Sequence, residues 1–298
     1  MKLGYIGLGK MGENMVLRLL EQKHDVVVYN RSKEAGLRLE KHGAKPSISL
    51  VDMIQKLETP RTIWLMVPHV ATTSLVNELA SILEQGDVVI DGGNTLFSNT
   101  IQHAKIFETV GVTLLDAGVS GGPHGARHGA CIMVGGQKNT YELYEHLFSD
   151  LSVPNGYAYV GVSGAGHFVK MVHNGIEYGM MQSIAEGFNL LHTSAYNLDV
   201  QSISSLYNHG SVIESHLIAW LQQAYIKNGK DLIDISGSVD QNGEGEWTSV
   251  YADSVTEQTP SIDLAVQFRK NSKENPSYIG KVLSAMRREF GGHDVSLK

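Results

Sequence analysis

The sequence predicts an α/β fold in which a mostly parallel, helix-covered sheet is followed by a smaller all-helical domain. In the first half of the chain, short β-rich runs alternate with segments of helical periodicity. Continuous apolar strands separated by helices are typical of a parallel sheet covered on both faces. In the second half, strand signals are nearly absent. Because 298 residues exceed the usual size of one hydrophobic core, we expect two domains, at residues 1–162 and 163–298.

The expected elements follow in order along the chain. Strands are expected at residues 2–7, 25–29, 62–67, 87–91, 112–116, 131–135 and 157–160, the later ones being close enough together to pair differently. Helical periodicity lies between the early strands, as at residues 11–22 and 33–41. A long helix without proline is expected over residues 164–191, followed by helices at 200–209, 215–228, 248–256, 262–271 and 277–288. Residues 237–245 are expected to form a long loop, and the last ten residues an irregular tail.

Composition excludes several classes of protein. Apolar residues make up 42% of the chain, which is ordinary for a soluble globular protein. The net charge of −7 argues against nucleic acid as a partner, because proteins that bind it usually carry a basic face. No apolar run is long enough to span a bilayer, and the first strand leaves no room for a signal peptide. We therefore expect a cytoplasmic protein with no membrane partner.

Cys131 is the single cysteine of the chain, so it cannot form an internal disulfide. It lies in the apolar run Ala-Cys-Ile-Met-Val, from which we expect a buried structural thiol rather than a nucleophile. No spacing of His and Cys suggests a zinc site, and we expect no metal.

A glycine-rich turn follows the first expected strand and opens the first expected helix; it consists of Gly7, Leu8, Gly9, Lys10, Met11 and Gly12. The glycines permit a tight turn, a close approach of backbone to pyrophosphate, and close helix–strand packing. The helix N-terminus then offers unpaired N–H groups and a positive dipole end to the phosphates. This pattern predicts a Rossmann dinucleotide-binding domain.

The end of the second expected strand bears on the choice of cofactor. Asn30, Arg31 and Ser32 stand there, and none is the carboxylate that accepts hydrogen bonds from the ribose 2′-hydroxyl of NAD. Arg31 can pair with a 2′-phosphate and Ser32 can donate to it, so we favour NADP, with NAD as the alternative. Arg31 as a solvated loop residue is the other interpretation. Val67 and Asn94 complete the predicted cofactor site.

The stretch Lys-Met-Val-His-Asn-Gly-Ile-Glu-Tyr at residues 170–178 places several polar groups on one helix face. At i, i+3, i+4, i+7 and i+8, that face carries Lys170, His173, Asn174, Glu177 and Tyr178. The other faces carry Val169, Val172, Ile176 and Met180, which we expect to hold the helix by apolar packing. A base, an acid and several hydrogen-bonding groups on one rigid surface predict a site.

Two expected strands end in glycine-rich turns, Asp-Gly-Gly-Asn at 91–94 and Asp-Ala-Gly-Val-Ser-Gly-Gly at 116–122. Ligands bind at the carboxyl ends of strands in open α/β sheets. Ser120 and the N–H groups of Gly121 and Gly122 can form a small anion-binding nest. Paired glycines that serve only a tight turn are the plain alternative.

In these residues the chain resembles the β-hydroxyacid dehydrogenases, and within them most closely the 6-phosphogluconate dehydrogenases. The signals shared across the larger group are Gly-Leu-Gly-Lys-Met-Gly (7–12), Val-Ser-Gly-Gly (119–122) and Gly-Ala-Gly-His-Phe-Val-Lys (164–170). The more specific ones are Asp-Gly-Gly-Asn (91–94), Lys-Met-Val-His-Asn-Gly-Ile-Glu-Tyr-Gly (170–179) and Phe-Gly-Gly-His (290–293). The resemblance covers nearly the whole chain, which looks like a short form of the family.

The resemblance implies oxidative decarboxylation of 6-phosphogluconate to ribulose 5-phosphate without a metal. Lys170 would be the base and Glu177 the acid. The carboxylate and hydroxyls would be held by Asn94, Ser120, Gly121, Gly122, His173 and Asn174. The phosphate would be held by Tyr178, Thr248, Arg269 and Arg287, with a contact from His293. In the family the residues matching Arg287 and His293 come from a neighbouring subunit, which implies a homodimer or a dimer-based tetramer with shared sites.

One departure concerns the phosphate end. The long enzymes of the family carry Lys before the Trp-Thr pair, whereas this chain has Glu246 there. A carboxylate that faces a phosphate dianion is repulsive. Three explanations are open: Glu246 points away from the phosphate, another basic residue takes the place of the lysine, or the preferred substrate is not 6-phosphogluconate.

Other interpretations stay open at this point. A dehydrogenase of a simpler β-hydroxyacid such as 3-hydroxyisobutyrate would share Lys170 but would not need Glu177. A non-catalytic NADP-binding sensor has no use for a base–acid pair. For Lys170 and Glu177 the structural alternative is an ion pair across helical turns, and for Arg269, Arg287 and His293 it is an exposed helix end.

Overall fold

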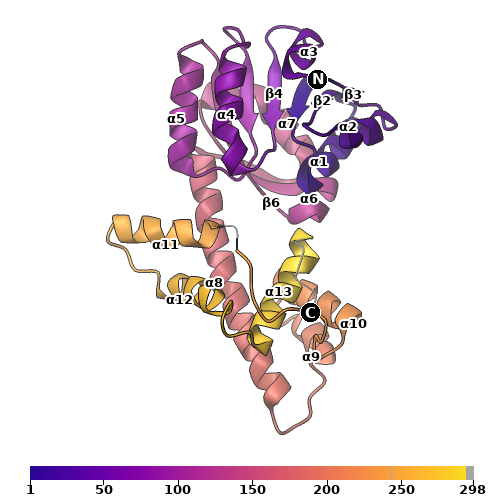
Figure 1. Cartoon of the computed structure of the whole chain (residues 1–298), viewed down its shortest axis with the longest axis vertical. Helices are drawn as coiled ribbons and strands as arrows, with labels where there is room; N and C mark the ends of the chain where they lie inside the picture. The colour runs from indigo at the N-terminus through magenta and orange to yellow at the C-terminus, as the bar shows by residue number, and fades with distance from the viewer. Residues whose placement is uncertain (242, 293–298) are drawn as a thin grey trace. The chain divides into compact units, whose positions relative to one another are not determined.

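The computed structural model describes residues 1–241 and 243–292. The chain divides into two compact units, Met1–Lys170 and Met171–Lys298. The division falls inside the long helix α8 (Ala165–Thr193), which runs on through it (Figure 1). The boundary expected between residues 162 and 163 lies just before this helix. His293 lies outside the described residues.

The first unit is an α/β domain, as predicted. Its eight strands form one sheet in the order β3-β2-β1-β4-β5-β6-β7-β8. The strands are β1 (Lys2–Ile6), β2 (Asp25–Tyr29), β3 (Lys45–Pro46), β4 (Thr62–Leu65), β5 (Val88–Asp91), β6 (Thr113–Ser120), β7 (Ala130–Gly135) and β8 (Ser152–Gly161). All neighbouring strands pair in parallel except β6 and β7, which are antiparallel. The carboxyl ends of β1, β2, β4, β5 and β6 therefore lie at one edge of the sheet.

Seven helices connect these strands: α1 (Lys10–Glu21), α2 (Lys33–Glu40), α3 (Leu50–Gln55), α4 (His69–Ala80), α5 (Phe97–Glu108), α6 (Gly122–His128) and α7 (Lys138–Leu151). Successive strand residues enter different apolar clusters, because side chains alternate between the two faces of a strand. Tyr5 and Trp64 pack with residues of α1 and α7. Ile6 and Ile63 pack with residues of α3, α4 and α5. Both faces of the sheet are thus covered, as the apolar strands require.

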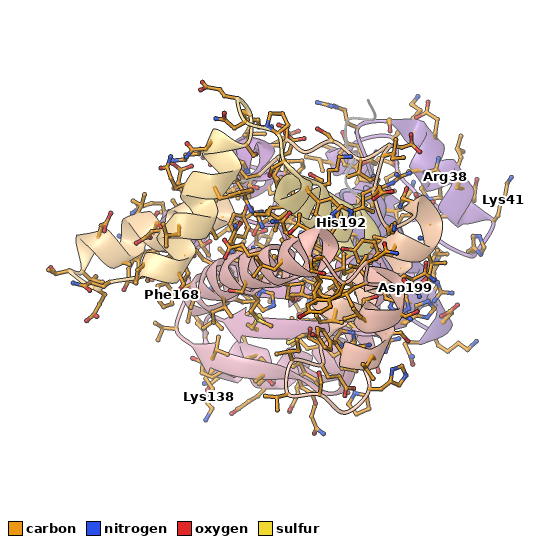
Figure 2. All side chains as sticks on the ribbon, turned by 90° about the horizontal axis from the view of Figure 1, so that it is seen from below. Arg38, Lys41, Lys138, Phe168, His192 and Asp199 are labelled. Carbon is orange, nitrogen blue, oxygen red and sulfur yellow. The ribbon has the colours of Figure 1, made fainter. Side chains whose placement is uncertain are left out.

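The regular elements among the described residues of the second unit are all helices, as predicted. After α8 come α9 (Val200–Tyr207), α10 (His216–Asn228), α11 (Glu244–Ser254), α12 (Pro260–Asn271) and α13 (Tyr278–Gly291). Asp199, Ser215 and Ser277 cap α9, α10 and α13 through their side-chain oxygens. His192, labelled in Figure 2, stands near the end of α8. Its ring centroid lies 3.9 Å from that of Tyr278, and its Nε2 lies 2.9 Å from Asp231 Oδ1. None of the described helices is long and apolar enough to cross a membrane.

Three expectations are wrong in detail. Cys131 is exposed rather than buried, because it lies on the outward-facing side of β7. Ile176 and Met180 are 54% and 44% exposed and do not hold α8 by packing. Helix α11 begins at Glu244, inside the stretch expected to be a loop. Periodicity marks a helix face as apolar without showing whether another element covers it.

Candidate active site

The glycine-rich turn joins β1 to α1 with room for a phosphate. Gly7 has a φ of +98°, and a Cβ at Gly12 would lie 2.0 Å from the carbonyl oxygen of Gly7. Only glycine fits either place. No atom lies within 4 Å of the position that a Cβ on Gly9 would take, and no side chain caps α1 at Gly9. The open space and the uncapped helix N-terminus fit a dinucleotide pyrophosphate.

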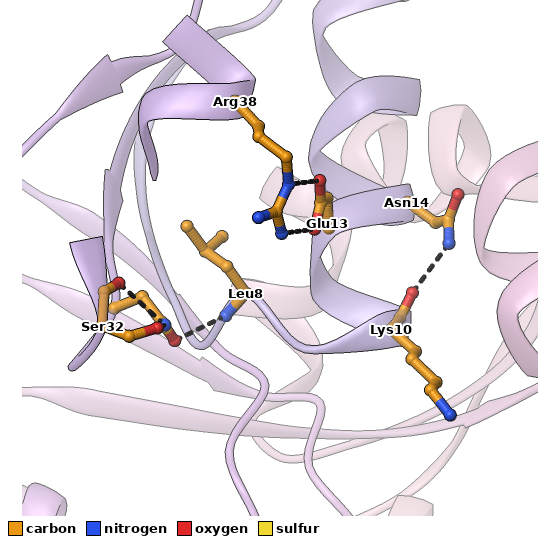
Figure 3. Close-up of polar contacts among 7 residues, drawn as sticks. Leu8, Lys10, Glu13, Asn14, Ser32 and Arg38 are labelled. Carbon is orange, nitrogen blue, oxygen red and sulfur yellow. Dashed lines mark hydrogen bonds and ion pairs between the residues drawn. The ribbon is translucent and has the colours of Figure 1, made fainter. Parts of the chain in front are cut away.

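Asn30 ties this turn to the loop that follows β2 (Figure 3). The backbone N–H of Leu8 donates to Asn30 Oδ1 at 3.0 Å, and Asn30 Nδ2 donates to the carbonyl and to Oγ of Ser32 at 3.1 and 3.0 Å. Since the Ser32 hydroxyl accepts from Asn30, its own proton is left to donate outward. Arg31, between them, is exposed.

The neighbouring helices stiffen the same region. Arg38 of α2 donates from Nε and Nη2 to the two carboxylate oxygens of Glu13 in α1, at 2.9 and 2.7 Å. At the start of α1, the Asn14 side chain donates to the carbonyl of Lys10 at 2.7 Å (Figure 3). The bidentate pair fixes α2 against α1. Met11, the remaining predicted residue of this turn, is half-buried in the first turn of α1.

The turn after β5 is stabilised by hydrogen bonds among its own residues. Asp91 accepts hydrogen bonds from Gly93 N and Thr95 Oγ1, both at 2.9 Å. A Cβ on Gly93 would lie 2.8 Å from the carbonyl oxygen of Val67, and a Cβ on Gly7 3.0 Å from Val67 Cγ1. Val67 thus lies between the first turn and the turn that carries Asn94.

The end of β6 forms the third turn. Gly121 has a φ of +125° and precedes α6, which begins at Gly122. Ser120 is half-buried at the end of the strand. Two residues earlier, β6 meets the start of α8, since a Cβ on Gly118 would lie 2.4 Å from Lys170 Cβ. The first unit therefore gathers the predicted dinucleotide turn, Val67, the Asn94 turn, Ser120 and Lys170 around the carboxyl ends of its strands.

In the second unit, α8 carries the rest of the predicted polar face. His173 Nδ1 lies 3.0 Å from Asn174 Oδ1 and 4.0 Å from Glu177 Oε2. Asn174 is buried, whereas His173 and Glu177 are half-buried. The acid and the histidine therefore share one accessible strip of the helix.

Tyr178 and Arg269 form the buried part of this site. The guanidinium carbon of Arg269 lies 3.4 Å from the centroid of the Tyr178 ring. Arg269 is 1% exposed and Arg287 is 6% exposed. Burial is the main cause that lowers the pKa of Arg269 to about 10, and the nearby charge of Arg287 contributes to the same shift. Burial also raises the pKa of Tyr178.

Thr248 docks α11 on α8. Its hydroxyl donates to the carbonyl of Met171 at 2.8 Å, with Glu244 O at 3.2 Å, and a Cβ on Gly175 would lie 2.7 Å from Thr248 Cγ2. Since the proton of the hydroxyl is used in these bonds, Thr248 can only accept from a ligand in this arrangement. Its contact with phosphate stays a prediction.

Glu246 forms an ion pair with Lys270 of α12. Lys270 Nζ lies 2.6 Å from Glu246 Oε1, and the two side chains are 45% and 41% exposed. A cation thus neutralises the carboxylate that was expected to oppose a phosphate.

Besides Asp91, two buried carboxylates near the predicted residues were not predicted as site residues. Asp116 of β6 binds the first turn of α8. Glu244 is 8% exposed at the start of α11, and its charge acts on Tyr178. Asp116 is the last residue of the strand expected at residues 112–116, and a carboxylate at the end of an apolar strand is the signal that could have found it. Glu244 falls in the stretch that was expected to be a loop.

Sequence comparison shows which family has this arrangement. The profile of the NAD-binding domain of 6-phosphogluconate dehydrogenase matches residues 2–161, and that of the C-terminal domain of the same enzyme matches residues 166–294. The chain belongs to the 6-phosphogluconate dehydrogenase family. YqeC of Bacillus subtilis (strain 168) is 42% identical to it over 298 residues, which are the whole of both chains.

Two further relatives differ in the cofactor that their descriptions name. The NAD(+)-dependent, decarboxylating 6-phosphogluconate dehydrogenase of Haloferax volcanii is 37% identical over 300 residues, covering 100% of this chain and 99% of that one. Among solved structures, Plasmodium falciparum 6-phosphogluconate dehydrogenase is 27% identical, with a TM-score of 0.81 over 93% of this chain and 66% of that one. Its structures include complexes with NADP+ and with 6-phosphogluconate.

Proposed function

We propose that this protein catalyses the oxidative decarboxylation of 6-phosphogluconate to ribulose 5-phosphate and carbon dioxide, with NADP preferred over NAD. The observation that carries the proposal is the buried guanidinium of Arg269. Its Nε has no hydrogen-bond partner among the described residues, and the charge of Glu177 affects its pKa less than burial does. A buried charge without a counterion is costly, and a substrate phosphate would supply the missing charge.

Tyr178, Arg269 and Arg287 would bind the phosphate together. A phosphate dianion accepts hydrogen bonds from the forked guanidinium groups of arginine in a bidentate manner. The Tyr178 hydroxyl stays protonated because burial raises its pKa, so it can donate to the same anion. Asn94, Ser120, the N–H groups of Gly121 and Gly122, His173 and Asn174 would hold the carboxylate and hydroxyls.

Lys170 and Glu177 would carry the proton transfers. The bound cofactor supplies the hydride acceptor. Lys170 takes the proton of the C3 hydroxyl as hydride leaves C3, which gives a 3-keto acid. Loss of carbon dioxide then leaves a pair of electrons on the C3 oxygen, where protonated Lys170 stabilises them. Glu177 donates a proton to the former C2 of the substrate, which becomes C1 of ribulose 5-phosphate, and the ketose is complete.

The hydrogen-bond polarity at Ser32 supports NADP. Asn30 donates to Ser32 Oγ, so the Ser32 hydroxyl has a proton to give, and Arg31 stands beside it. A 2′-phosphate only accepts hydrogen bonds, and it needs donors and positive charge. The NAD-dependent alternative is favoured by the Haloferax volcanii relative, whose name specifies NAD(+).

A dehydrogenase of a simple β-hydroxyacid is the second candidate. Mycobacterium tuberculosis 3-hydroxyisobutyrate dehydrogenase has a TM-score of 0.75 against this chain at 18% identity, so the two share the fold. An acid without a phosphate would leave Arg269 unpaired, which favours the sugar phosphate acid. A non-catalytic NADP-binding sensor would retain Lys170 and Glu177 without a use for either.

We also propose that the protein is a cytoplasmic homodimer, or a dimer-based tetramer, with shared sites. Ile176 and Met180 lie exposed on α8, close to the proposed substrate residues. A second copy that covered them would bury apolar surface next to the site. His293 would add a substrate contact there.

Absorbance of the reduced nicotinamide tests the activity. We expect turnover of 6-phosphogluconate with NADP, a lower kcat/KM with NAD, and none with 3-hydroxyisobutyrate. Turnover of simple hydroxyacids alone would support the second candidate. No reduced cofactor with any hydroxyacid would support the sensor.

A further inference from the structure

A buried carboxylate of β6 binds the start of the helix that carries Lys170. Asp116 is fully buried. Its Oδ1 accepts a hydrogen bond from Gly164 N at 2.8 Å, and its Oδ2 accepts one from His167 N at 2.9 Å. Backbone N–H groups in the first turn of a helix have no intrahelical partner and must find acceptors elsewhere. Asp116 supplies two of these acceptors from another element.

Helix α8 cannot supply these acceptors itself. A self-capped helix places Ser or Thr at the N-cap and Glu or Gln three residues later, and each side chain binds the N–H of the other position. Here Gly164, with a φ of +92°, precedes the helix and has no side chain. His167, three residues later, is engaged through Nδ1 with Thr100 Oγ1 at 2.7 Å. The Asp116 carboxylate therefore accepts both of the N–H groups that, in a capping box, the N-cap side chain and the side chain three residues later would bind.

The helix start also contacts the strands through its backbone. A Cβ on Gly166 would lie 2.6 Å from the carbonyl oxygen of Asp116 and 2.5 Å from that of Met133. A Cβ on Gly135 would lie 2.7 Å from Asp116 Oδ1. With glycine on both sides of the contact, no flexible side chain separates α8 from β6 and β7. The first turn of α8 is thereby fixed to the sheet.

Strand β6 contacts Lys170 directly. Gly118 lies two residues beyond Asp116, on the same side of the strand. The position of its Cβ would be 2.4 Å from Lys170 Cβ. Lys170 follows His167 by one helical turn, so a shift of the capped turn moves Lys170 against Gly118.

We propose that Asp116 is the positioning residue of Lys170, which it holds in place by capping α8. The proposal rests on the proposed role of Lys170 as the base. In this proposal Asp116 contacts neither substrate nor cofactor, and its two hydrogen bonds determine the position of Lys170.

Asp116→Asn tests this, because the amide keeps the size of the carboxylate but can accept only one of the two N–H groups. Asp87→Asn is the matched control. Asp87 is also fully buried and accepts from two backbone N–H groups, those of Arg61 at 2.6 Å and Glu84 at 3.0 Å, with a further ion pair to the Arg61 side chain at 3.0 Å. It lies just before the amino-terminal end of β5. Both substitutions should lower the melting temperature.

Only Asp116→Asn should change the chemistry. We expect its kcat per folded molecule to fall about 10- to 100-fold, because a misplaced base loses its reactive geometry. The dissociation constant of NADP should not change. The primary isotope effect on kcat, with substrate deuterated at C3, should rise because hydride transfer becomes slower. Asp87→Asn should keep the kcat and isotope effect of the wild type.

Equal kcat and isotope effects in the two variants would overturn the proposal. If Asp116→Asn does not fold, Gly118→Ala is the second test: its methyl group would lie 2.4 Å from Lys170 Cβ and 2.8 Å from the carbonyl oxygen of Gly166, so it displaces Lys170 and the capped turn while the Asp116 carboxylate is kept. It should lower kcat and leave NADP affinity intact, and an unchanged kcat would contradict the proposal. Absence of turnover in the wild type with either cofactor would instead contradict the proposed function.

Discussion

The guanidinium carbon of Arg269 lies 3.4 Å above the ring of Tyr178, and both side chains are almost completely removed from solvent. The face of an aromatic ring attracts a cation, but it does not replace a counterion. The pKa of Arg269 is accordingly lowered to about 10 by burial. The buried positive charge of Arg269 lowers the stability of the folded state, and an anionic ligand would offset this loss.

Arg269→Met should separate stability from binding. Because burial disfavours the charged form of this side chain, we expect its replacement by an apolar side chain to raise the free energy of unfolding by about 1 kcal/mol. The KM for 6-phosphogluconate should rise at least about 30-fold, since a desolvated charge pair with the phosphate is lost. Denaturant titration and steady-state kinetics give the two values. Arg269→Lys, which keeps the charge, is the control; a stabilised variant with normal KM would exclude phosphate at this position.

Phosphate recognition should weaken at high pH. The pKa of Arg269 in the folded protein is about 10, below its ordinary value, so the side chain stays charged at neutral pH and loses its proton as the pH rises through about 10. The Kd for 6-phosphogluconate should therefore increase near that pH. Gluconate, which lacks the phosphate, should show no such increase. Parallel curves for the two acids, measured by calorimetry, would contradict this assignment.

Glu246→Gln should improve binding of the phosphorylated substrate. The substitution removes a negative charge and releases Lys270, which lies 2.6 Å from Glu246 and next to Arg269 along α12. We expect the KM for 6-phosphogluconate to fall about two- to five-fold, with little loss of stability because exposed ion pairs contribute about 0–1 kcal/mol. Lys270→Ala should raise the KM. If neither variant changes it, the pair does not face the phosphate.

Arg31→Asp should reverse the cofactor preference. A carboxylate repels a 2′-phosphate and accepts hydrogen bonds from a 2′-hydroxyl, so kcat/KM should fall for NADP and rise for NAD. Lys41→Asp makes the same change of charge just after α2, at another exposed position, and should leave the ratio near its original value. Equal kinetics of wild type and Arg31→Asp with NADP would show that Arg31 is a solvated loop residue.

Local signals predicted the glycine-rich turn and the long helix well. The glycine pattern at residues 7–12 follows a strand and opens a helix, and both glycines with close backbone contacts, Gly7 and Gly12, occupy positions that exclude a Cβ. The long helix expected over residues 164–191 is α8, at Ala165–Thr193. These features depend on neighbouring residues alone, which a sequence pattern records.

Features that depend on distant residues were not predictable in this way. The cap on α8 comes from Asp116, 48 and 51 residues away from its two donors. The partner of Glu246 is Lys270, 24 residues later. Whether Cys131, Ile176 and Met180 are covered depends on which elements pack against them, and periodicity does not determine that. The roles of the site residues stay predictions.

The central claim is a dehydrogenation coupled to loss of carbon dioxide, and the stoichiometry of the two products tests it most directly. With 6-phosphogluconate labelled with carbon-13 at C1 and with NADP as cofactor, labelled carbon dioxide and NADPH should form in equal amounts. Reduced cofactor formed without labelled carbon dioxide would contradict the account, because Lys170 and Glu177 would then serve a simple hydroxyacid oxidation.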